Sequence, residues 1–289
     1  MINKNDIERL IPDLEDVNLI NSGGQKTVFK GSFKRENVVI KVIEIGTMLG
    51  EENYIYNVSF NRIKREISLL EKIDSPYLPK LSQIKCDFFE KDNVTYYYYS
   101  EEFIDGFTLD NYTSARKDAI KIALHVSEAI KYLWDNFKVV HRDIKPNNIM
   151  YNSITNKFLL IDLGIALILN ETSLTKTDVI PGTIMYMSPE QLTQPKRILD
   201  FRSDLFQLGV CLYETITGFH PFVRDESINN KYEIRNDILS NKAEKIINLT
   251  SDFPIEFLEF IDRIINKHPY ARFRSMDEVI NLLNGLIRG

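Results

Sequence analysis

The sequence predicts an α+β protein in which a smaller, mostly antiparallel β lobe with one main helix precedes a larger, mainly α lobe. Short runs of β-branched and aromatic residues alternate with polar turns in the first third of the chain, as in antiparallel strands. After that, longer stretches repeat apolar residues at the helical period of 3.6. The 289 residues, 44% of them hydrophobic, can form two packed lobes. We expect these lobes at residues 1–103 and 104–289.

The first lobe contains four strand-like runs. They lie at residues 28–33, 38–43, 86–89 and 94–99. One helical pattern interrupts them, because Ile63, Ile67 and Leu70 are spaced at i, i+4 and i+7 with charged residues between them. We expect this helix to pack on the sheet, and the four consecutive tyrosines at 96–99 to pack across strands.

The second lobe contains four long helical patterns and a short buried strand. The helices are expected at residues 120–134, 204–217, 255–266 and 276–286, and the strand at 158–161. Ser275 and Glu278 have the spacing of a capping box for the last helix.

Composition excludes several classes of function. The 36 Lys and Arg residues against 41 Asp and Glu give a net charge of −5, which disfavours nucleic acid as a partner. No apolar stretch approaches the roughly 20 residues of a membrane-spanning helix, and the four histidines lack zinc-ligand spacing. The two cysteines, Cys86 and Cys211, are expected to be buried and form no C-x-x-C motif, which favours a reducing, cytoplasmic location.

Residues 141–148, HRDIKPNN, carry the strongest signal for chemistry. A surface turn at Pro146 is the alternative interpretation. However, the complete pattern H-R-D-x-K-x-x-N resembles a known catalytic-loop signature and is improbable by chance.

Three further motifs accompany this loop. An apolar run ends in Asp162 and Gly164, which alone indicates only a turn. Lys41 lies inside an apolar strand, where an ammonium group needs a partner unless the strand is at a sheet edge. Residues 182–190 read GTIMYMSPE.

From Ile20 to Arg272, these motifs resemble those of the eukaryotic-type (Hanks-type) protein kinases, in particular the Ser/Thr branch. Residues 171–177 are similar to the activation loop of bacterial Ser/Thr kinases. The resemblance implies the two-lobed protein kinase fold, with ATP in the cleft and transfer of its γ-phosphoryl group to Ser or Thr hydroxyls of proteins. The alternatives are a pseudokinase that binds nucleotide or partner proteins without turnover and a small-molecule phosphotransferase.

The resemblance also implies roles for individual catalytic residues. Asp143 would orient the substrate hydroxyl, and Lys145 would hold the γ-phosphate. Lys41 would pair the α- and β-phosphates and be held by Glu66, for which Glu71 is a competing assignment. Thr183 would contact the catalytic Asp and Lys.

Cofactor contacts follow from the same resemblance. Asn148 and Asp162 would bind Mg²⁺. The other nucleotide-contacting positions are Asn21, Gly23, Val28, Val39, Glu102, Ile104 and Met150. Asn21 and Lys26 replace the outer glycines of the phosphate-covering loop. Glu101 occupies the usually apolar gatekeeper position, unless the strand is shifted in register.

The resemblance also implies structural and regulatory roles for other residues. Glu190 would form a buried ion pair with Arg272, Asp204 would brace the HRD loop, and His141 would pack as a structural residue. Phosphorylation by the kinase itself is expected at Thr172, Thr175 or Thr177. The expected partners are protein substrates and a second copy of the chain for trans-autophosphorylation.

Overall fold

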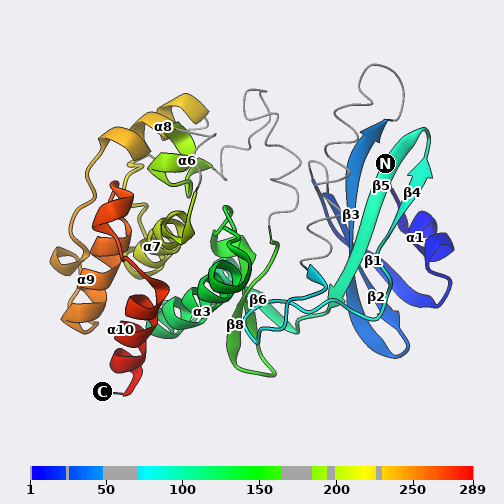
Figure 1. The fold of residues 1–289 in the computed structure, drawn as a ribbon, viewed down its shortest axis with the longest axis horizontal. Coiled ribbons are helices and arrows are strands. Elements are labelled where there is room, and N and C mark those ends of the chain that lie inside the picture. The colour runs from blue at the N-terminus through cyan, green and yellow to red at the C-terminus, as the bar shows by residue number, and fades with distance from the viewer. Residues whose placement is uncertain are drawn as a thin grey trace. The chain divides into compact units, whose positions relative to one another are not determined.

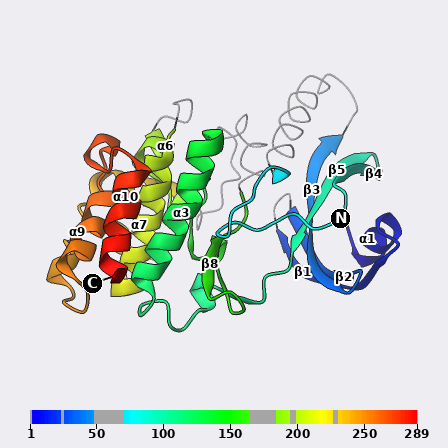
Figure 2. The ribbon, with the colours of Figure 1, turned by 60° about the horizontal axis from the view of Figure 1, so that its bottom comes forward.

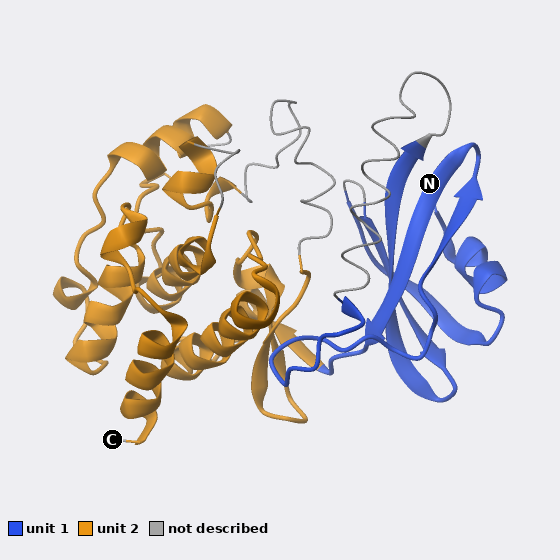
Figure 3. Cartoon of the chain, viewed as in Figure 1, with its two compact units in different colours: residues 1–105, 165–172 blue, residues 106–164, 173–289 orange. Residues whose placement is uncertain are grey.

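The computed structural model describes residues 2–23, 26–47, 70–163, 184–193, 199–225 and 230–288. The chain divides into two compact units, Met1–Asp105 with Ile165–Thr172 and Gly106–Gly164 with Ser173–Gly289 (Figure 3). The first unit is mostly an antiparallel sheet, and the second is mostly helical (Figure 1).

The first unit contains helix α1 and a five-stranded antiparallel sheet in the order β1-β2-β3-β5-β4. The elements are α1 (Lys4–Leu10), β1 (Leu14–Gly23), β2 (Lys26–Phe33), β3 (Glu36–Thr47), β4 (Asp87–Lys91) and β5 (Val94–Glu102). Helix α1 begins with a reciprocal capping box, in which the Asn3 amide oxygen and the Asp6 carboxylate each accept the other residue's backbone N–H.

The two faces of this sheet have different roles. Val38, Ile40 and Val42 share an apolar cluster with Ile7 of α1, which lies against the sheet (Figure 1). Because side chains alternate along a strand, Val39 and Lys41 fall on the opposite face. Lys41 therefore shares its face of β3 with buried Ile43 and lies beside the tyrosines of β5, on the face away from this cluster.

The tyrosines of β5 pack across strands, as the sequence predicts. The Phe88 and Tyr97 ring centroids are 4.8 Å apart, and those of Phe89 and Tyr96 are 5.3 Å apart. These pairs join β4 to β5 along both faces of the sheet.

The second unit combines a three-stranded sheet, β6-β7-β8, with packed helices. Its strands and main helices are β6 (Gly106–Thr108), α3 (Ala119–Phe137), β7 (Ile149–Asn152), β8 (Lys157–Leu160), α6 (Pro189–Thr193), α7 (Phe201–Thr217), α8 (Lys231–Ser240), α9 (Ile255–Ile264) and α10 (Met276–Arg288). Short 3-10 helices lie at Leu109–Asn111, Pro146–Asn148, Ile246–Asn248 and Pro269–Ala271. Helix α3 contacts α7, α10 and β8, and α7 also contacts α9 (Figure 2).

Helix α7 is the centre of this unit, because most of its residues are buried. A Cβ atom on Gly209 would lie 2.7 Å from side-chain atoms of Ile264 and Ile265, so glycine allows α9 and the residue after it to approach α7 closely. The helix ends at Gly218, whose φ of 79° is the left-handed conformation that glycine adopts readily.

The structure confirms the predicted α+β class, the antiparallel sheet and the four long helices, with shifts at their ends. The predicted helix around Ile63 and Ile67 lies outside the described residues. The capping box of α10 is only half formed: Ser275 Oγ accepts the Glu278 N–H at 3.3 Å, but the Glu278 carboxylate accepts from Arg274. Burial of both cysteines was expected, but only Cys211 is fully buried, and Cys86 is half-buried on the way into β4.

Across the described ranges, no helix combines the length and the apolar character needed to cross a bilayer.

His125 of α3 gives the fold an expected pH dependence. Its Nδ1 accepts the backbone N–H of Phe158 at 3.1 Å, and burial, aided by nearby Lys121 and Lys157, lowers its pKa to about 4. Since an unfolded histidine has a pKa near 6.5, the free energy of unfolding should fall as pH drops through the window from about 6.5 to about 4. His125→Gln keeps an acceptor but cannot titrate, so its stability should fall less over this window.

Chemical denaturation at about pH 7.5 and about pH 5 measures this difference. His268→Gln, at an exposed position, is the matched control. Equal losses of stability in wild type and His125→Gln would contradict the assignment.

Candidate active site

The loop after α3 is held by two polar side chains of α7. Buried Asp204 accepts the backbone N–H groups of His141 and Arg142, each at 2.8 Å. Gln207 accepts the N–H of Ile144 at 3.0 Å and donates to the Arg142 carbonyl at 2.9 Å. These contacts confirm the predicted brace by Asp204. The sequence motifs did not point to Gln207. A polar residue about one helical turn after Asp204, on the same face of an otherwise apolar helix, could have indicated this second contact.

The brace matters because Arg142 adopts a φ of 70°, a left-handed conformation that costs on the order of 1 kcal/mol in a residue with a side chain. Burial raises the pKa of Asp204 to about 7, although both backbone N–H donors favour the ionised form. The strained loop conformation therefore depends on a carboxylate that is itself costly to bury.

Asp204→Asn should loosen this loop. An amide has only one oxygen, so one of the two backbone N–H groups would face an NH₂ group and lose its acceptor. A buried donor without a partner costs about 1 to 3 kcal/mol. We expect a loss of unfolding free energy in this range and a lower kcat, measured by denaturation and steady-state kinetics. Asp13→Asn, at an exposed position, is the control, and wild-type values in Asp204→Asn would contradict the brace.

The braced loop presents a cluster of three polar side chains. Lys145 Nζ lies 3.1 and 2.9 Å from the two carboxylate oxygens of Asp143. Asn148 Nδ2 donates to the Asp143 backbone carbonyl at 2.7 Å and to its Oδ2 at 2.9 Å. The side chains of Asp143 and Lys145 are 17% and 21% exposed, so an oriented carboxylate remains accessible to a substrate proton.

Asp162 follows β8 at the end of the β7–β8 pair where Asn148 also lies. The Ile161 N–H donates to the Asn148 carbonyl at 2.9 Å, and Ile149 pairs with Leu160. Asp162 has a φ of 69°, which turns the chain sharply after the strand. The strand pairing therefore brings the Asn148 amide and the Asp162 carboxylate to the same end of the hairpin.

The donor set fits magnesium bound together with a phosphate ligand. Asn148 uses its amide nitrogen for both hydrogen bonds, so its amide oxygen is the atom suited to a metal, and Asp162 supplies a carboxylate. In the described parts of the chain, no group of three or more His, Cys, Asp or Glu side chains could hold a metal by itself. Mg²⁺ typically binds in this way, through one or two protein oxygens, substrate phosphates and water.

His141 has a structural role, as predicted. It is 1% exposed, and its Nδ1 accepts the Asp143 N–H at 3.4 Å, which assigns the ring hydrogen to Nε2, 3.2 Å from the Ile161 carbonyl. Burial lowers the pKa of His141 and favours this neutral form. His141 thus ties the loop to the end of β8.

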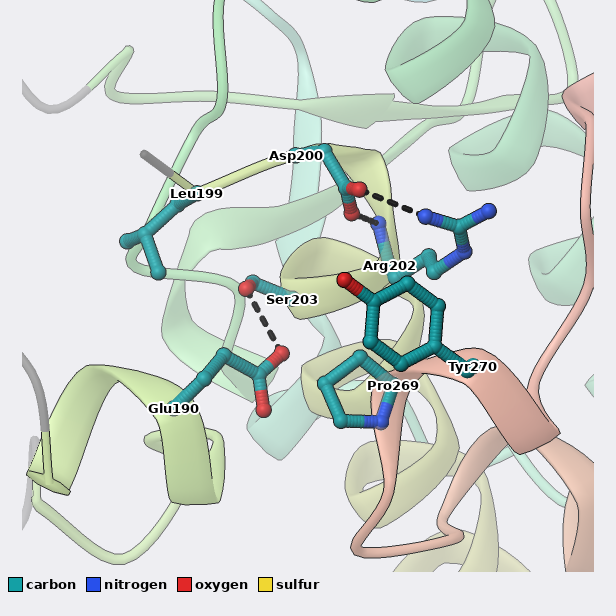
Figure 4. Close-up of a pocket in the computed structure, with 7 residues that line it drawn as sticks. All are labelled: Glu190, Leu199, Asp200, Arg202, Ser203, Pro269 and Tyr270. Atoms are coloured by element: carbon teal, nitrogen blue, oxygen red, sulfur yellow. Dashed lines mark hydrogen bonds and ion pairs between the residues drawn. The ribbon is translucent and has the colours of Figure 1, made fainter. Parts of the chain in front are cut away.

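The predicted ion pair between Glu190 and Arg272 is present and buried. Arg272 donates to the two Glu190 carboxylate oxygens at 2.7 and 3.1 Å, and the Ser203 hydroxyl donates to Glu190 at 2.7 Å. Figure 4 shows Glu190 of α6 turned toward Ser203 of α7 at the wall of a pocket. Burial opposes ionisation of Glu190, but the bonds and charge of Arg272 outweigh it and lower the Glu190 pKa.

The predicted nucleotide residues of the first unit lie on its strands. Asn21 and Gly23 of β1 pair with Val28 and Lys26 of β2, and Val39 of β3 pairs with Glu101 of β5. Glu102 ends β5, Ile104 follows it, and Met150 lies on β7 of the second unit. Glu66, Thr183 and the threonines 172, 175 and 177 lie outside the described residues.

Lys41 has a partner that the sequence did not reveal. Its Nζ lies 2.7 Å from Glu101 Oε2. Which strand residues meet depends on the pairing of β3 with β5, which the sequence patterns leave open.

Comparison with known proteins identifies the family of this chain. Residues 14–282 match the model of the family described as protein kinase domain. Serine/threonine-protein kinase PrkC of Bacillus subtilis is 30% identical over 217 residues, covering 73% of this chain and 31% of that protein. Serine/threonine-protein kinase PknB of Mycobacterium leprae is 37% identical over 187 residues, covering 62% and 28%.

A probable serine/threonine-protein kinase PknB of Lactococcus lactis is 28% identical over 269 residues, covering 90% of this chain and 40% of that protein. The chain thus spans less than half the length of these relatives. The chain belongs to the protein kinase domain family, with the two-lobed fold that the sequence predicted.

Proposed function

We propose that this chain transfers the γ-phosphoryl group of ATP, with Mg²⁺, to Ser and Thr hydroxyls of protein substrates. The observation that carries the proposal is the cluster of Asp143, Lys145 and Asn148, held in place by Asp204. Phosphoryl transfer needs positioning and charge stabilisation more than covalent chemistry, and this cluster combines an oriented base with a cation.

Each residue of the cluster has a defined task in this proposal. Asp143 orients the substrate hydroxyl and takes up its proton, while Lys145 holds the γ-phosphate. Asn148 and Asp162 hold the metal, which supplies positive charge to the phosphate oxygens when bound. Lys41 pairs the α- and β-phosphates, Glu66 holds Lys41, and Thr183 contacts the catalytic loop.

The lobes are proposed to be residues 1–103 and 104–289. The remaining nucleotide contacts are assigned to Asn21, Gly23, Val28, Val39, Glu102, Ile104 and Met150. The acidic charge argues against nucleic acid as a partner, and the free thiols of Cys86 and Cys211 fit a reducing, cytoplasmic location. The kinase phosphorylates its own loop at Thr172, Thr175 or Thr177, in trans within a homodimer.

Transfer of radiolabelled phosphate from ATP to a generic basic protein tests the proposal. We expect Mg²⁺-dependent labelling, with phosphoserine and phosphothreonine after acid hydrolysis. Nucleotide binding without transfer would support the pseudokinase alternative. Phosphotyrosine alone would contradict the Ser/Thr type.

A further inference from the structure

The ion pair between Lys41 and Glu101 is almost completely buried within the first unit. The two side chains are only 7% and 8% exposed, and their charged atoms are 2.7 Å apart. Burying either charge alone would be strongly unfavourable, so each makes burial of the other acceptable. This pair therefore belongs to the interior of the first unit and is not a surface ion pair.

The register of the sheet explains why these two residues meet. Lys41 of β3 is directly opposite Tyr99 of β5, and Glu101 is opposite Val39. Lys41 and Glu101 are thus diagonal neighbours on one face, at a separation that long side chains can bridge. The Lys41 ammonium also lies 5.6 Å from the centre of the Tyr99 ring, which favours a cation.

The backbone around Glu101 is held by hydrogen-bonded neighbours on both sides of its strand. Its strand pairs with β3 on one side, and Leu81 forms a bridge to Glu101 on the other. On that second side, the Glu102 N–H donates to the Lys80 carbonyl and the Ser82 N–H to the Ser100 carbonyl, each at 2.9 Å. The backbone of β5 therefore fixes the position from which the Glu101 carboxylate reaches Lys41.

We propose that Glu101 is a counter-ion that competes with the nucleotide's phosphates for the Lys41 ammonium. The inference rests on the proposed function, which takes Lys41 as the phosphate-pairing lysine. A phosphate that reaches Lys41 must approach the buried Glu101 carboxylate, which already contacts the Lys41 ammonium. Because the Glu101 carboxylate already neutralises the Lys41 ammonium at 2.7 Å, a phosphate gains less from that ammonium, so Glu101 weakens nucleotide binding and acts as a positioning residue for Lys41.

Binding of Mg·ADP, measured by calorimetry, tests this inference without relying on turnover. Glu101→Gln removes the negative charge and keeps the shape, so Kd should fall about tenfold. In a Lys41→Met background, the same substitution should produce no gain, because the contested ammonium is absent. Glu90→Gln, an exposed glutamate on β4, is the matched control and should leave Kd unchanged.

The possible outcomes distinguish the competition by Glu101 from the kinase assignment. Equal or weaker binding by folded Glu101→Gln, or the same gain with Lys41→Met, would overturn the competition but not the kinase assignment. Absence of Mg·ADP binding by the wild type would overturn both. If Glu101→Gln fails to fold, Glu101→Asp replaces it in the experiment. Its shorter side chain holds the carboxylate further from Lys41, so Mg·ADP should bind more tightly than to the wild type, by less than about tenfold. Unchanged or weaker binding by Glu101→Asp would overturn the inference.

Discussion

Replacing Asp143 by Asn is expected to reduce protein phosphorylation strongly while leaving nucleotide binding near the wild-type level. The carboxylate contacts Lys145 and Asn148 and is the one base that the braced loop presents beside them. An amide of the same shape cannot take up the substrate proton. General-base catalysis typically contributes about 10² to 10⁴-fold, so kcat should fall by that factor in a quantitative phosphate-transfer assay.

Asp252→Asn is the matched control for this experiment. It makes the same chemical change at a carboxylate that is 67% exposed and paired with Arg116. This control should retain kcat and Mg·ADP affinity. A kcat for Asp143→Asn within a few-fold of wild type would remove Asp143 from the catalytic role.

Replacing Arg272 by Met should cause the largest loss of stability of any single change considered for the second unit. The guanidinium is fully buried and donates to Glu190 and to the backbone carbonyls of Arg202 and Asn266. Removing it strands the Glu190 carboxylate in the interior, which costs about 3 to 5 kcal/mol. Urea denaturation should show this loss as a lower midpoint with an unchanged slope.

A surface pair provides the control. Lys80 and Asp74 form an ion pair whose side chains are 49% and 85% exposed, so water screens it and Lys80→Met should leave the denaturation midpoint nearly unchanged. The double variant Glu190→Gln, Arg272→Met should be more stable than Arg272→Met alone, because no charge is then stranded. Similar losses in Arg272→Met and Lys80→Met would contradict the importance of burial.

Elements with a regular apolar period could be predicted from the sequence, and weakly patterned elements could not. The predicted helix at 204–217 carries a strong apolar pattern and is observed as α7. Helix α1 has only seven residues, and β1 has mostly exposed side chains, so neither shows a clear period.

Some contacts of the candidate site could likewise be predicted from the sequence, and others could not. Asp143, Asn148 and Asp162 are close in the chain, and a short hairpin is enough to bring them together. The pair of Lys41 and Glu101 depends instead on the register of two strands joined by a long segment, with an irregularity between Glu44 and Gly46. Register of this kind is set by tertiary packing, which the sequence patterns alone do not specify.

Mass spectrometry of the protein after incubation with Mg²⁺ and ATP tests the central claim most directly, because it reports activity, acceptor type and position together. We predict added phosphoryl groups on Thr172, Thr175 or Thr177 in the wild type and none in Asp143→Asn. The same phosphopeptide map in both proteins, or no phosphorylation of the wild type or of any added protein substrate, would contradict it.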